Sequence, residues 1–536
     1  MAATGEPDTD TGERGKPAEQ RRTPPWAVPI VGGTADALLI GIVAAVISAV
    51  GAGNPSFWYD EAATISGATR TLPELARLIE DSDAAHPFYY LMMHGWFDLV
   101  PRTEFWARVP SWVAVGVAAG GLVVLARLLS TRAIAVCAGI IFAILPRTTA
   151  AGIEARPYGL TCAAAVWLTV VLVIAVRRDR VSSWLLYAVL LALSALLNVY
   201  LVLMVVVHGF TLLVLRAARR QYGAWLIAVG ATCALLVPYL LFLKGQSNQL
   251  SWIAPLSDDT IVDVLVNQYF EYSIPFAASV GVLITVTVLV PFFRRRCSSI
   301  PASGQLLLLC AGWSAIPTTV ILAVSAVSQP LYVDRYLTFT SPAIALALAI
   351  CAVGIGQRRT GIALIISILA LVSIPNYVRQ RGDYAKTGMD YSAVADLIAR
   401  QASPGDCLLL DDTVDWEPGP IRPLVQARPD AYEDLVDVGA GRSATSMGTL
   451  WDENLAPFTV AYRIARCSTI WTVSQKDSTL AAHEAGFALP PGPRFATANA
   501  FWVPRELGFR LVERWQFNLS QVTKAIRQGR DSAVGS

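Results

Sequence analysis

Long apolar runs separated by short polar segments dominate the first 376 residues of the chain. A helix needs about 17 to 25 mostly apolar residues to cross the hydrocarbon core of a bilayer. Runs of about this length lie near residues 27–52, 109–127, 133–147, 157–176, 182–197, 199–215, 224–243, 275–293, 304–327, 336–353 and 361–376. The pattern predicts a polytopic α-helical membrane protein with about eleven transmembrane helices, of which the third and the fifth are short.

The composition supports this prediction and excludes other classes of protein. Of 536 residues, 54% are hydrophobic and 15% are charged, whereas ordinary soluble domains carry roughly 25% charged residues. A water-soluble globular enzyme and a disordered protein are both excluded. The formal net charge of +2 gives no reason to expect a nucleic-acid partner. The expected environment is the lipid bilayer of the cell's inner (plasma) membrane.

Arginine residues predict the orientation of the chain, because loops rich in Lys and Arg face the cytoplasm. If the N-terminal tail is cytoplasmic, thirteen arginines fall in cytoplasmic loops: Arg127, Arg132, Arg177, Arg178, Arg180, Arg216, Arg219, Arg220, Arg294, Arg295, Arg296, Arg358 and Arg359. The opposite loops are longer in total and hold eight basic residues. Eleven spans then place the C-terminus outside the cytoplasm.

Three regions differ in character. Residues 1–26 are polar and have no apolar run, which predicts a disordered cytoplasmic tail. Residues 27–376 form the predicted transmembrane domain, with a long first outer loop at 53–108. Residues 377–536 carry evenly spread charges and short apolar runs, which predicts an extracytoplasmic α/β domain.

Within the third region we predict strands near residues 407–410, 468–473 and 511–517, and helices near 390–400, 453–465 and 478–485. In the first outer loop, Thr71-Leu72-Pro73-Glu74 is typical of a capping box that opens a short amphipathic helix. Residues 86–100, rich in aromatic residues and Met, predict a second helix near the membrane interface.

Acidic residues at the end of a transmembrane helix are candidates for function, because charge near lipid is costly. Asp60 and Glu61 follow the first span within Phe57-Trp58-Tyr59-Asp60-Glu61. An interfacial aromatic belt explains Trp58 and Tyr59, but it does not explain two adjacent acids, which repel each other. The alternative is that both acids are solvated loop residues.

Three further motifs lie on the predicted outer side. Glu154 and Arg156 precede Tyr158 before the fourth span and could simply pair with each other. Arg335, within Tyr332-Val333-Asp334-Arg335-Tyr336, is either a snorkelling side chain or a cation for a phosphate at headgroup depth. His86 precedes Pro87, and a lone His in this context is more often structural than catalytic.

Taken in order, these motifs resemble those of the GT-C superfamily of polyprenyl-phosphate-sugar-dependent glycosyltransferases. The resemblance is to the branch similar to protein O-mannosyltransferases and to mannosyltransferases of actinobacterial cell envelopes. It covers residues 27–376 and rests on WYDEA, HPFYYLMMHGWF, EFWARVPS, EARPY, LSWI and LYVDRY. One departure is that such proteins often read HPPL where this chain has His86-Pro87-Phe88-Tyr89.

The resemblance implies the GT-C fold and an inverting transfer of a sugar, mannose being favoured, from a polyprenyl monophosphate. The acceptor would be a hydroxyl of a cell-envelope glycan, lipoglycan or protein at the outer face of the membrane. Such a hydroxyl needs a carboxylate to take its proton. We expect Asp60 to be this base and Glu61 to orient the acceptor or to tune the pKa of the base, with the reverse assignment open.

The leaving prenyl phosphate gains negative charge, which a cation must stabilise. The expected donor phosphate and sugar contacts are Arg335, Arg156, Tyr158, Tyr336, His86 and Glu154. Glu154 would either hold Arg156 or contact a sugar hydroxyl.

No cofactor and no metal are expected, because the branch that the chain resembles transfers from a monophosphate without a metal. Two alternatives remain. One is a pentosyl transferase, such as an arabinosyl transferase, of the same fold. The other is a non-enzymatic transporter of a lipid or small molecule, which predicts acids inside the spans, where Asp36 is the clear example.

Among the eight cysteines, Cys407 and Cys467 lie in the predicted external domain, each at the start of a strand-like run. The starts of adjacent parallel strands can bring Cα atoms within the roughly 4.4 to 6.8 Å that a disulfide requires, and an oxidising compartment preserves the bond. We therefore predict a Cys407–Cys467 disulfide. The alternative is two buried free thiols.

Overall fold

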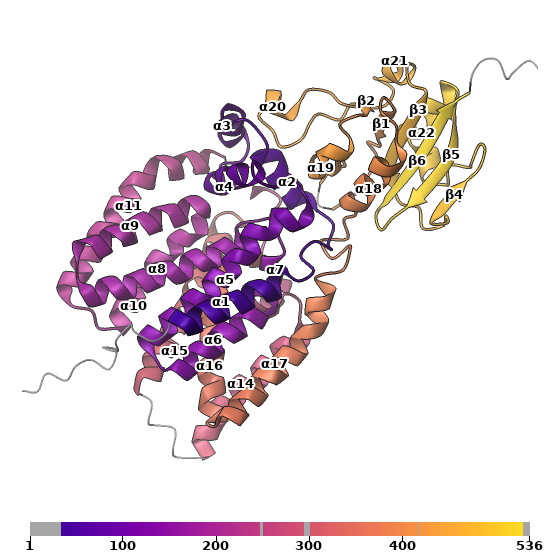
Figure 1. Cartoon of the computed structure of the whole chain (residues 1–536). Coiled ribbons are helices and arrows are strands. Elements are labelled where there is room, and N and C mark those ends of the chain that lie inside the picture. The colour runs from indigo at the N-terminus through magenta and orange to yellow at the C-terminus, as the bar shows by residue number, and fades with distance from the viewer. Residues whose placement is uncertain (1–33, 247–249, 294–300, 418, 529–536) are drawn as a thin grey trace, which may run out of the picture.

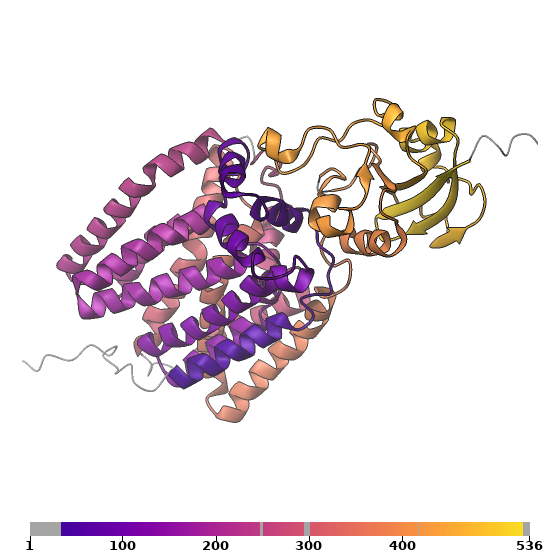
Figure 2. The same cartoon turned by 45° about the horizontal axis from the view of Figure 1, so that its top comes forward.

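The computed structural model describes residues 34–246, 250–293, 301–417 and 419–528. The predicted tail at 1–26 lies outside these ranges. Figure 1 shows a bundle of helices and, at one end of it, a smaller domain with a β-sheet; Figure 2 shows the same separation from a second direction.

Within the described residues each predicted span overlaps a helix; residues 27–33 of the first span lie outside the described ranges. These helices are α1 (Thr34–Ala49), α5 (Glu104–Leu129), α6 (Arg132–Ile144), α8 (Tyr158–Arg178), α9 (Val181–Leu197), α10 (Met204–Val214) after the turn η1 (Val199–Leu203), α11 (Arg219–Gly245), α14 (Ile274–Phe293), α15 (Pro301–Val327), α16 (Ser341–Gly356) after η4 (Asp334–Thr340), and α17 (Arg359–Arg379).

Fewer of these helices are long and apolar enough by themselves to cross a membrane. Within the described residues, six helices could cross a membrane, or eight if two bent pairs each count as one span. One bent pair joins α6 to α7 (Pro146–Gly152) at 62°. The other joins α12 (Asp259–Val262), η3 (Asp263–Asn267) and α13 (Gln268–Phe270) to α14 at 89°. The count of eleven therefore stays a prediction.

Small residues allow α1 and α5 to pack closely. A Cβ atom added to Gly116 would lie 2.6 Å from the carbonyl oxygen of Gly41, and one added to Gly120 would lie 2.9 Å from that of Ala37. Gly116 and Gly120 are four residues apart on one face of α5. This is the small-xxx-small spacing that brings helix backbones together in membranes.

Contacts between helix ends divide the bundle into two sides. Arg381, just after α17, donates from Nε to the carbonyl oxygen of Val50 at 2.6 Å, so the ends of α1 and α17 meet. At the start of α1, Asp36 pairs with Arg132 at 2.7 Å. The first outer loop and the C-terminal domain thus follow helix ends on one side, and Arg132 lies with the start of α1. Which side faces the cytoplasm stays a prediction.

The predicted first outer loop, residues 53–108, forms three helices: α2 (Tyr59–Ala68), α3 (Leu72–Asp81) and α4 (Pro87–Phe97). The backbone N–H of Thr71 donates to Glu74 Oε2 at 3.0 Å, so the capping box predicted for α3 is confirmed. These helices lie between the bundle and the C-terminal domain (Figure 1).

The C-terminal domain is a mixed six-stranded sheet with short helices. The strand order is β2-β1-β3-β6-β5-β4; β1 pairs in parallel with β2 and β3, and the other pairs are antiparallel. The strands are β1 (Cys407–Leu410), β2 (Val436–Asp437), β3 (Thr469–Gln475), β4 (His483–Ala485), β5 (Phe509–Gln516) and β6 (Ser520–Arg527). The helices are α18 (Tyr391–Gln401), α19 (Pro423–Ala427), α20 (Ala444–Met447), α21 (Ala461–Ile464) and α22 (Asn499–Glu506), with turns η5 (Pro429–Ala431) and η6 (Phe495–Thr497).

Two predicted elements of this domain are wrong. The helix expected at 478–485 is a loop that ends in β4, and of the helix expected at 453–465 only α21 forms. Strand β4 pairs with β5, so a distant partner, which a local pattern cannot reveal, sets its conformation. The structure joins Cys407 and Cys467 in a disulfide with a Cα–Cα distance of 6.0 Å.

Candidate active site

Asp60 lies in the first turn of α2, which places its carboxylate at the positive end of the helix dipole. Its side chain is 18% exposed, and Oδ2 lies 3.5 Å from Arg335 Nη2. The sequence separates these two residues by 275 positions. The structure therefore brings together the acid and the cation that the motifs singled out.

Arg335 is held by aromatic side chains as well as by Asp60. Its guanidinium carbon lies 5.6 Å from the ring centres of Trp58 and Trp252 and 5.8 Å from that of Tyr336. Its Nε donates to the hydroxyl of Tyr158 at 3.2 Å. A guanidinium stacked among rings keeps its charge while its N–H groups point in fixed directions.

Glu61 has a different environment from that of Asp60. Arg108 donates from Nε to Oε1 at 2.8 Å and from Nη2 to Oε2 at 2.6 Å. The backbone N–H of Ala155 donates to Oε1 at 2.7 Å. Both side chains of the pair are 0% exposed. Both oxygens of Glu61 are therefore already bonded inside the protein, and its role in the chemistry stays a prediction.

The loop before α8 carries Glu154 and Arg156, but these two residues do not pair with each other. Glu154 Oε2 instead lies 3.2 Å from Nζ of Lys386, a residue of the segment between α17 and α18. Arg156 Nη1 donates to the carbonyl oxygen of Asp60 at 3.4 Å. Arg156 therefore lies next to the backbone of the acid and is 6% exposed.

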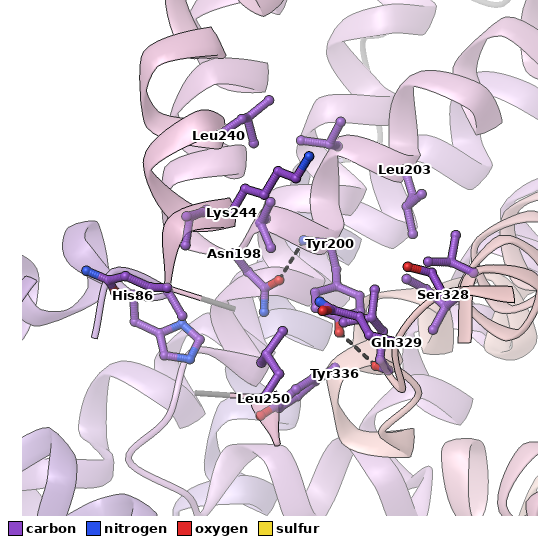
Figure 3. Close-up of a pocket in the computed structure, with 18 residues that line it drawn as sticks. His86, Asn198, Tyr200, Leu203, Leu240, Lys244, Leu250, Ser328, Gln329 and Tyr336 are labelled. Atoms are coloured by element: carbon purple, nitrogen blue, oxygen red, sulfur yellow. Dashed lines mark hydrogen bonds between the residues drawn. The ribbon is translucent and has the colours of Figure 1, made fainter. Parts of the chain in front are cut away.

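His86 and Tyr336 line a cavity of about 530 Å³. Most of its lining is apolar, with Leu203, Leu240 and Leu250 among the residues. In Figure 3, His86 lies on one side of the cavity and Ser328 and Gln329 on the other. Because Tyr336 also contacts Arg335, the cavity ends beside the Asp60–Arg335 pair.

Among the described residues, those that line this cavity are Ala85, His86, Asn198, Val199, Tyr200, Val202, Leu203, Leu240, Leu243, Lys244, Gln246, Leu250, Ile321, Val324, Ser328, Gln329, Leu331 and Tyr336. Burial and, to a lesser extent, the charge of Arg156 lower the pKa of His86 to about 4. His86 is therefore neutral at pH 7 and would contact an anion only as a hydrogen-bond donor.

The aromatic residues of the site form a continuous group. The ring of Tyr336 lies 6.3 Å from that of Tyr158 and 5.4 Å from that of Tyr200. The Tyr200 hydroxyl donates to the carbonyl oxygen of Leu331 at 2.7 Å. The two predicted tyrosines therefore lie together beside Arg335.

Candidate metal ligands do not converge. Among the residues that the structure describes, no group of three or more His, Cys, Asp and Glu side chains could hold a metal ion. The sequence has two Asp-X-Asp triplets: Asp8-Thr9-Asp10, which lies outside the described residues, and Asp81-Ser82-Asp83. Asp83 accepts a hydrogen bond from the Tyr90 hydroxyl. Transfer without a metal stays a prediction.

Several residues of the site were missed by sequence reasoning. Lys386 lies in no motif, and only the folded chain brings it to Glu154. Arg147 pairs with both Asp334 and Glu271, and Asp334 Oδ1 accepts the backbone N–H of Arg335 at 2.7 Å. The available signal was an arginine next to a proline at the end of a predicted span, which is a weak one.

The bundle of apolar helices followed by a sheet domain is the architecture of a membrane protein with the GT-C fold, and similarity to solved structures supports this class. Among solved structures, the chain is similar to ArnT from Cupriavidus metallidurans in the apo state. The TM-score is 0.55 and the identity 12%, over 92% of this chain and 98% of that chain. The same protein bound to undecaprenyl phosphate gives a TM-score of 0.51 at 11% identity, with the same coverage.

A weaker likeness is to the Archaeoglobus fulgidus oligosaccharyltransferase tethered with an acceptor peptide, with a TM-score of 0.44 and 12% identity over 82% of this chain and 69% of that chain. No protein-family model and no curated protein matches the sequence. The predicted resemblance to the GT-C superfamily is confirmed for the fold.

Proposed function

We propose that the chain is an inverting glycosyltransferase that moves a sugar, mannose in our proposal, from a polyprenyl monophosphate to a hydroxyl acceptor. The acceptor belongs to a cell-envelope glycan, lipoglycan or protein at the outer face of the membrane. The observation that carries the proposal is the Asp60–Arg335 contact of 3.5 Å beside the apolar cavity.

Asp60 is the base in this proposal. The acceptor hydroxyl oxygen forms a bond to the anomeric carbon of the sugar while its proton passes to Asp60. The bond between that carbon and the phosphate oxygen breaks, and polyprenyl phosphate leaves with the bonding electrons. Positioned general-base catalysis contributes about 10²- to 10⁴-fold to the rate of such reactions.

Arg335 is the cation for the leaving phosphate. In the ligand-free protein it pairs with Asp60, with Nη2 of the arginine 3.5 Å from Oδ2 of the acid. A donor phosphate competes for the same guanidinium, which frees Asp60 to accept a proton. Tyr158 and Tyr336 flank Arg335 and supply hydroxyl groups for the phosphate or the sugar.

The apolar cavity is the proposed site for the start of the prenyl chain, next to the phosphate. Its volume of about 530 Å³ lies within the usual range of roughly 300 to 1,000 Å³ for ligand sites. The likeness to a protein solved with undecaprenyl phosphate supports this assignment. His86, one of several polar residues of the lining, is a further group that we assign to the phosphate.

The test is transfer by the purified protein in lipid vesicles, with polyprenyl-phosphate mannose and polyprenyl-phosphate arabinose as donors and a panel of envelope glycans as acceptors. We expect transfer from the mannose donor and a loss of about 10²-fold or more in Asp60→Asn. Transfer from the arabinose donor alone would show that the sugar is arabinose and not mannose. Near-wild-type turnover of Asp60→Asn would overturn the mechanism.

A further inference from the structure

The segment between α17 and α18 contributes a partly buried lysine, Lys386, to the candidate active site. Lys386 Nζ lies 3.2 Å from Glu154 Oε2, and the two side chains are 11% and 10% exposed. Figure 1 shows this segment where the chain leaves α17 and enters the C-terminal domain. A residue outside the transmembrane bundle thus completes an ion pair two positions before Arg156.

Both domains hold this segment in place. On the bundle side, Gln380 donates to the carbonyl oxygen of Pro146 at 2.9 Å and accepts from the Thr149 hydroxyl at 2.8 Å. On the other side, Asp390 Oδ2 accepts the backbone N–H groups of Leu519 and Ser520 at 2.7 and 2.8 Å. The position of Lys386 therefore depends on how the two domains dock.

Two polar atoms of the adjacent loop are buried and have no hydrogen-bond partner in the described part of the chain: Glu154 Oε1 and Arg156 Nε. The loop itself is fixed, because the Ser111 hydroxyl donates to the carbonyl oxygen of Glu154 at 2.6 Å. Buried polar groups in folded proteins almost always find a partner. An unfilled acceptor in a fixed loop points to a ligand that donates a hydrogen bond.

A sugar hydroxyl has the required chemistry. The hydroxyl donates a hydrogen bond to a carboxylate. The same oxygen accepts a hydrogen bond from an ammonium or guanidinium group. Glu154 uses Oε2 for Lys386, and Oε1 has no hydrogen-bond partner among the described residues. The ammonium of Lys386 has three N–H groups, one of which serves the contact with Glu154 Oε2 at 3.2 Å.

We propose that Glu154 and Lys386 form a recognition subsite for a hydroxyl of the donor sugar, distinct from the Asp60–Arg335 pair that handles the proton and the phosphate. This inference rests on the proposed function. It assigns the segment before the C-terminal domain a direct part in choosing the sugar. A site built to hydrogen-bond a hydroxyl strongly rejects an analogue that lacks it.

The test measures binding of two lipids to the purified full chain: polyprenyl-phosphate mannose and polyprenyl phosphate without a sugar. We expect Glu154→Gln and Lys386→Met to weaken binding of the sugar-bearing lipid about tenfold or more and to leave binding of the bare lipid unchanged. Lys476→Met, at an exposed lysine of the C-terminal domain, is the matched control and should change neither affinity.

An equal loss of affinity for both lipids would overturn the subsite. Deoxy analogues of the donor add a readout that altered folding does not produce. The wild type should bind one of the deoxy analogues more weakly than it binds the full donor. Glu154→Gln, which keeps the shape of the side chain, should bind that analogue and the full donor equally well. If every deoxy analogue loses as much in the variant as in the wild type, the subsite is wrong. If the wild type binds neither lipid, the proposed function fails instead.

Discussion

Adjacent acids in this chain have opposite environments, although their sequence context is the same. Asp60 is partly exposed and faces Arg335, whereas Glu61 is fully buried against Arg108. In the first turn of a helix, consecutive residues point about 100° apart. One acid therefore faces the site and its neighbour faces the protein interior. The sequence predicted that this pair matters but could not divide the roles.

Replacing Arg335 by Ala should impair use of the donor more than use of the acceptor, because its proposed partner is the donor phosphate. We expect the KM for the lipid donor to rise by about 10-fold or more, which corresponds to the loss of one charge-assisted contact. Steady-state kinetics with each substrate varied in turn measure this. A change in acceptor affinity alone would show that Arg335 does not bind the donor phosphate.

The pH dependence of stability provides a second test. The pKa of His86 is lowered from 6.5 to about 4, chiefly by burial. Between these values the unfolded chain binds a proton that the folded chain does not, so acidification through this window favours unfolding. The melting temperature of His86→Gln should therefore fall less than that of the wild type between pH 6.5 and pH 4. Parallel curves for the two proteins would contradict this.

Packing between helices explains why the motifs meet. The Glu61–Arg108 pair ties α2 to α5, and three carbonyl oxygens before α2 also accept from the Arg108 guanidinium: those of Ala52, Pro55 and Ser56. This contact fixes the start of α2 and hence Asp60. The motif EFWARVPS, which contains Arg108, is thus structural support for the neighbouring WYDEA motif.

Breaking this buried pair should destabilise the protein. Glu61→Gln leaves Arg108 buried without a counter-charge, and the loss of one partner of a buried ion pair typically costs about 3 to 5 kcal/mol. Thermal unfolding in detergent measures the effect, with Glu80→Gln at an exposed position of α3 as the control. A variant that is as stable as the wild type but inactive would instead indicate that Glu61 takes part in the chemistry.

Across the whole molecule, the C-terminal domain packs against the helix that carries Asp60. Trp451 Nε1 donates to the Tyr59 hydroxyl at 3.1 Å, and the Ser66 hydroxyl donates to the carbonyl oxygen of Leu450 at 2.7 Å. Ser392 accepts the backbone N–H of Phe57 at 3.0 Å. The domain therefore contacts α2 and the chain before it, so it and the acid occupy the same side of the bundle.

We predict that this side is extracytoplasmic. A reporter enzyme that folds only outside the cytoplasm, fused to the C-terminal end, should be active. The reason is the arginine pattern, which places the opposite loops inside. A fusion that is active only with a cytoplasmic reporter would reverse the topology and exclude an outer-face acceptor.

The disulfide gives an independent check of the compartment, because such bonds persist where conditions are oxidising. Cys407 and Cys467 are separated by 60 positions, and closing a loop of this length stabilises the folded state by about 4 kcal/mol in the chain-entropy model. Mass spectrometry of the non-reduced protein should find the two cysteines linked. Both thiols free to alkylation after unfolding would contradict the prediction.

The sequence determined the class of fold, the positions of the apolar helices and the motifs near the site, because hydrophobic length and short polar motifs are local properties. Only the tertiary structure separated Asp60 from Glu61, paired Glu154 with Lys386 instead of Arg156, and turned an expected helix into β4. In each case the deciding partner is distant along the chain: Arg335, Lys386 or β5. The sequence shows which polar and charged residues would be costly to bury. Which of them are in contact depends on the tertiary structure.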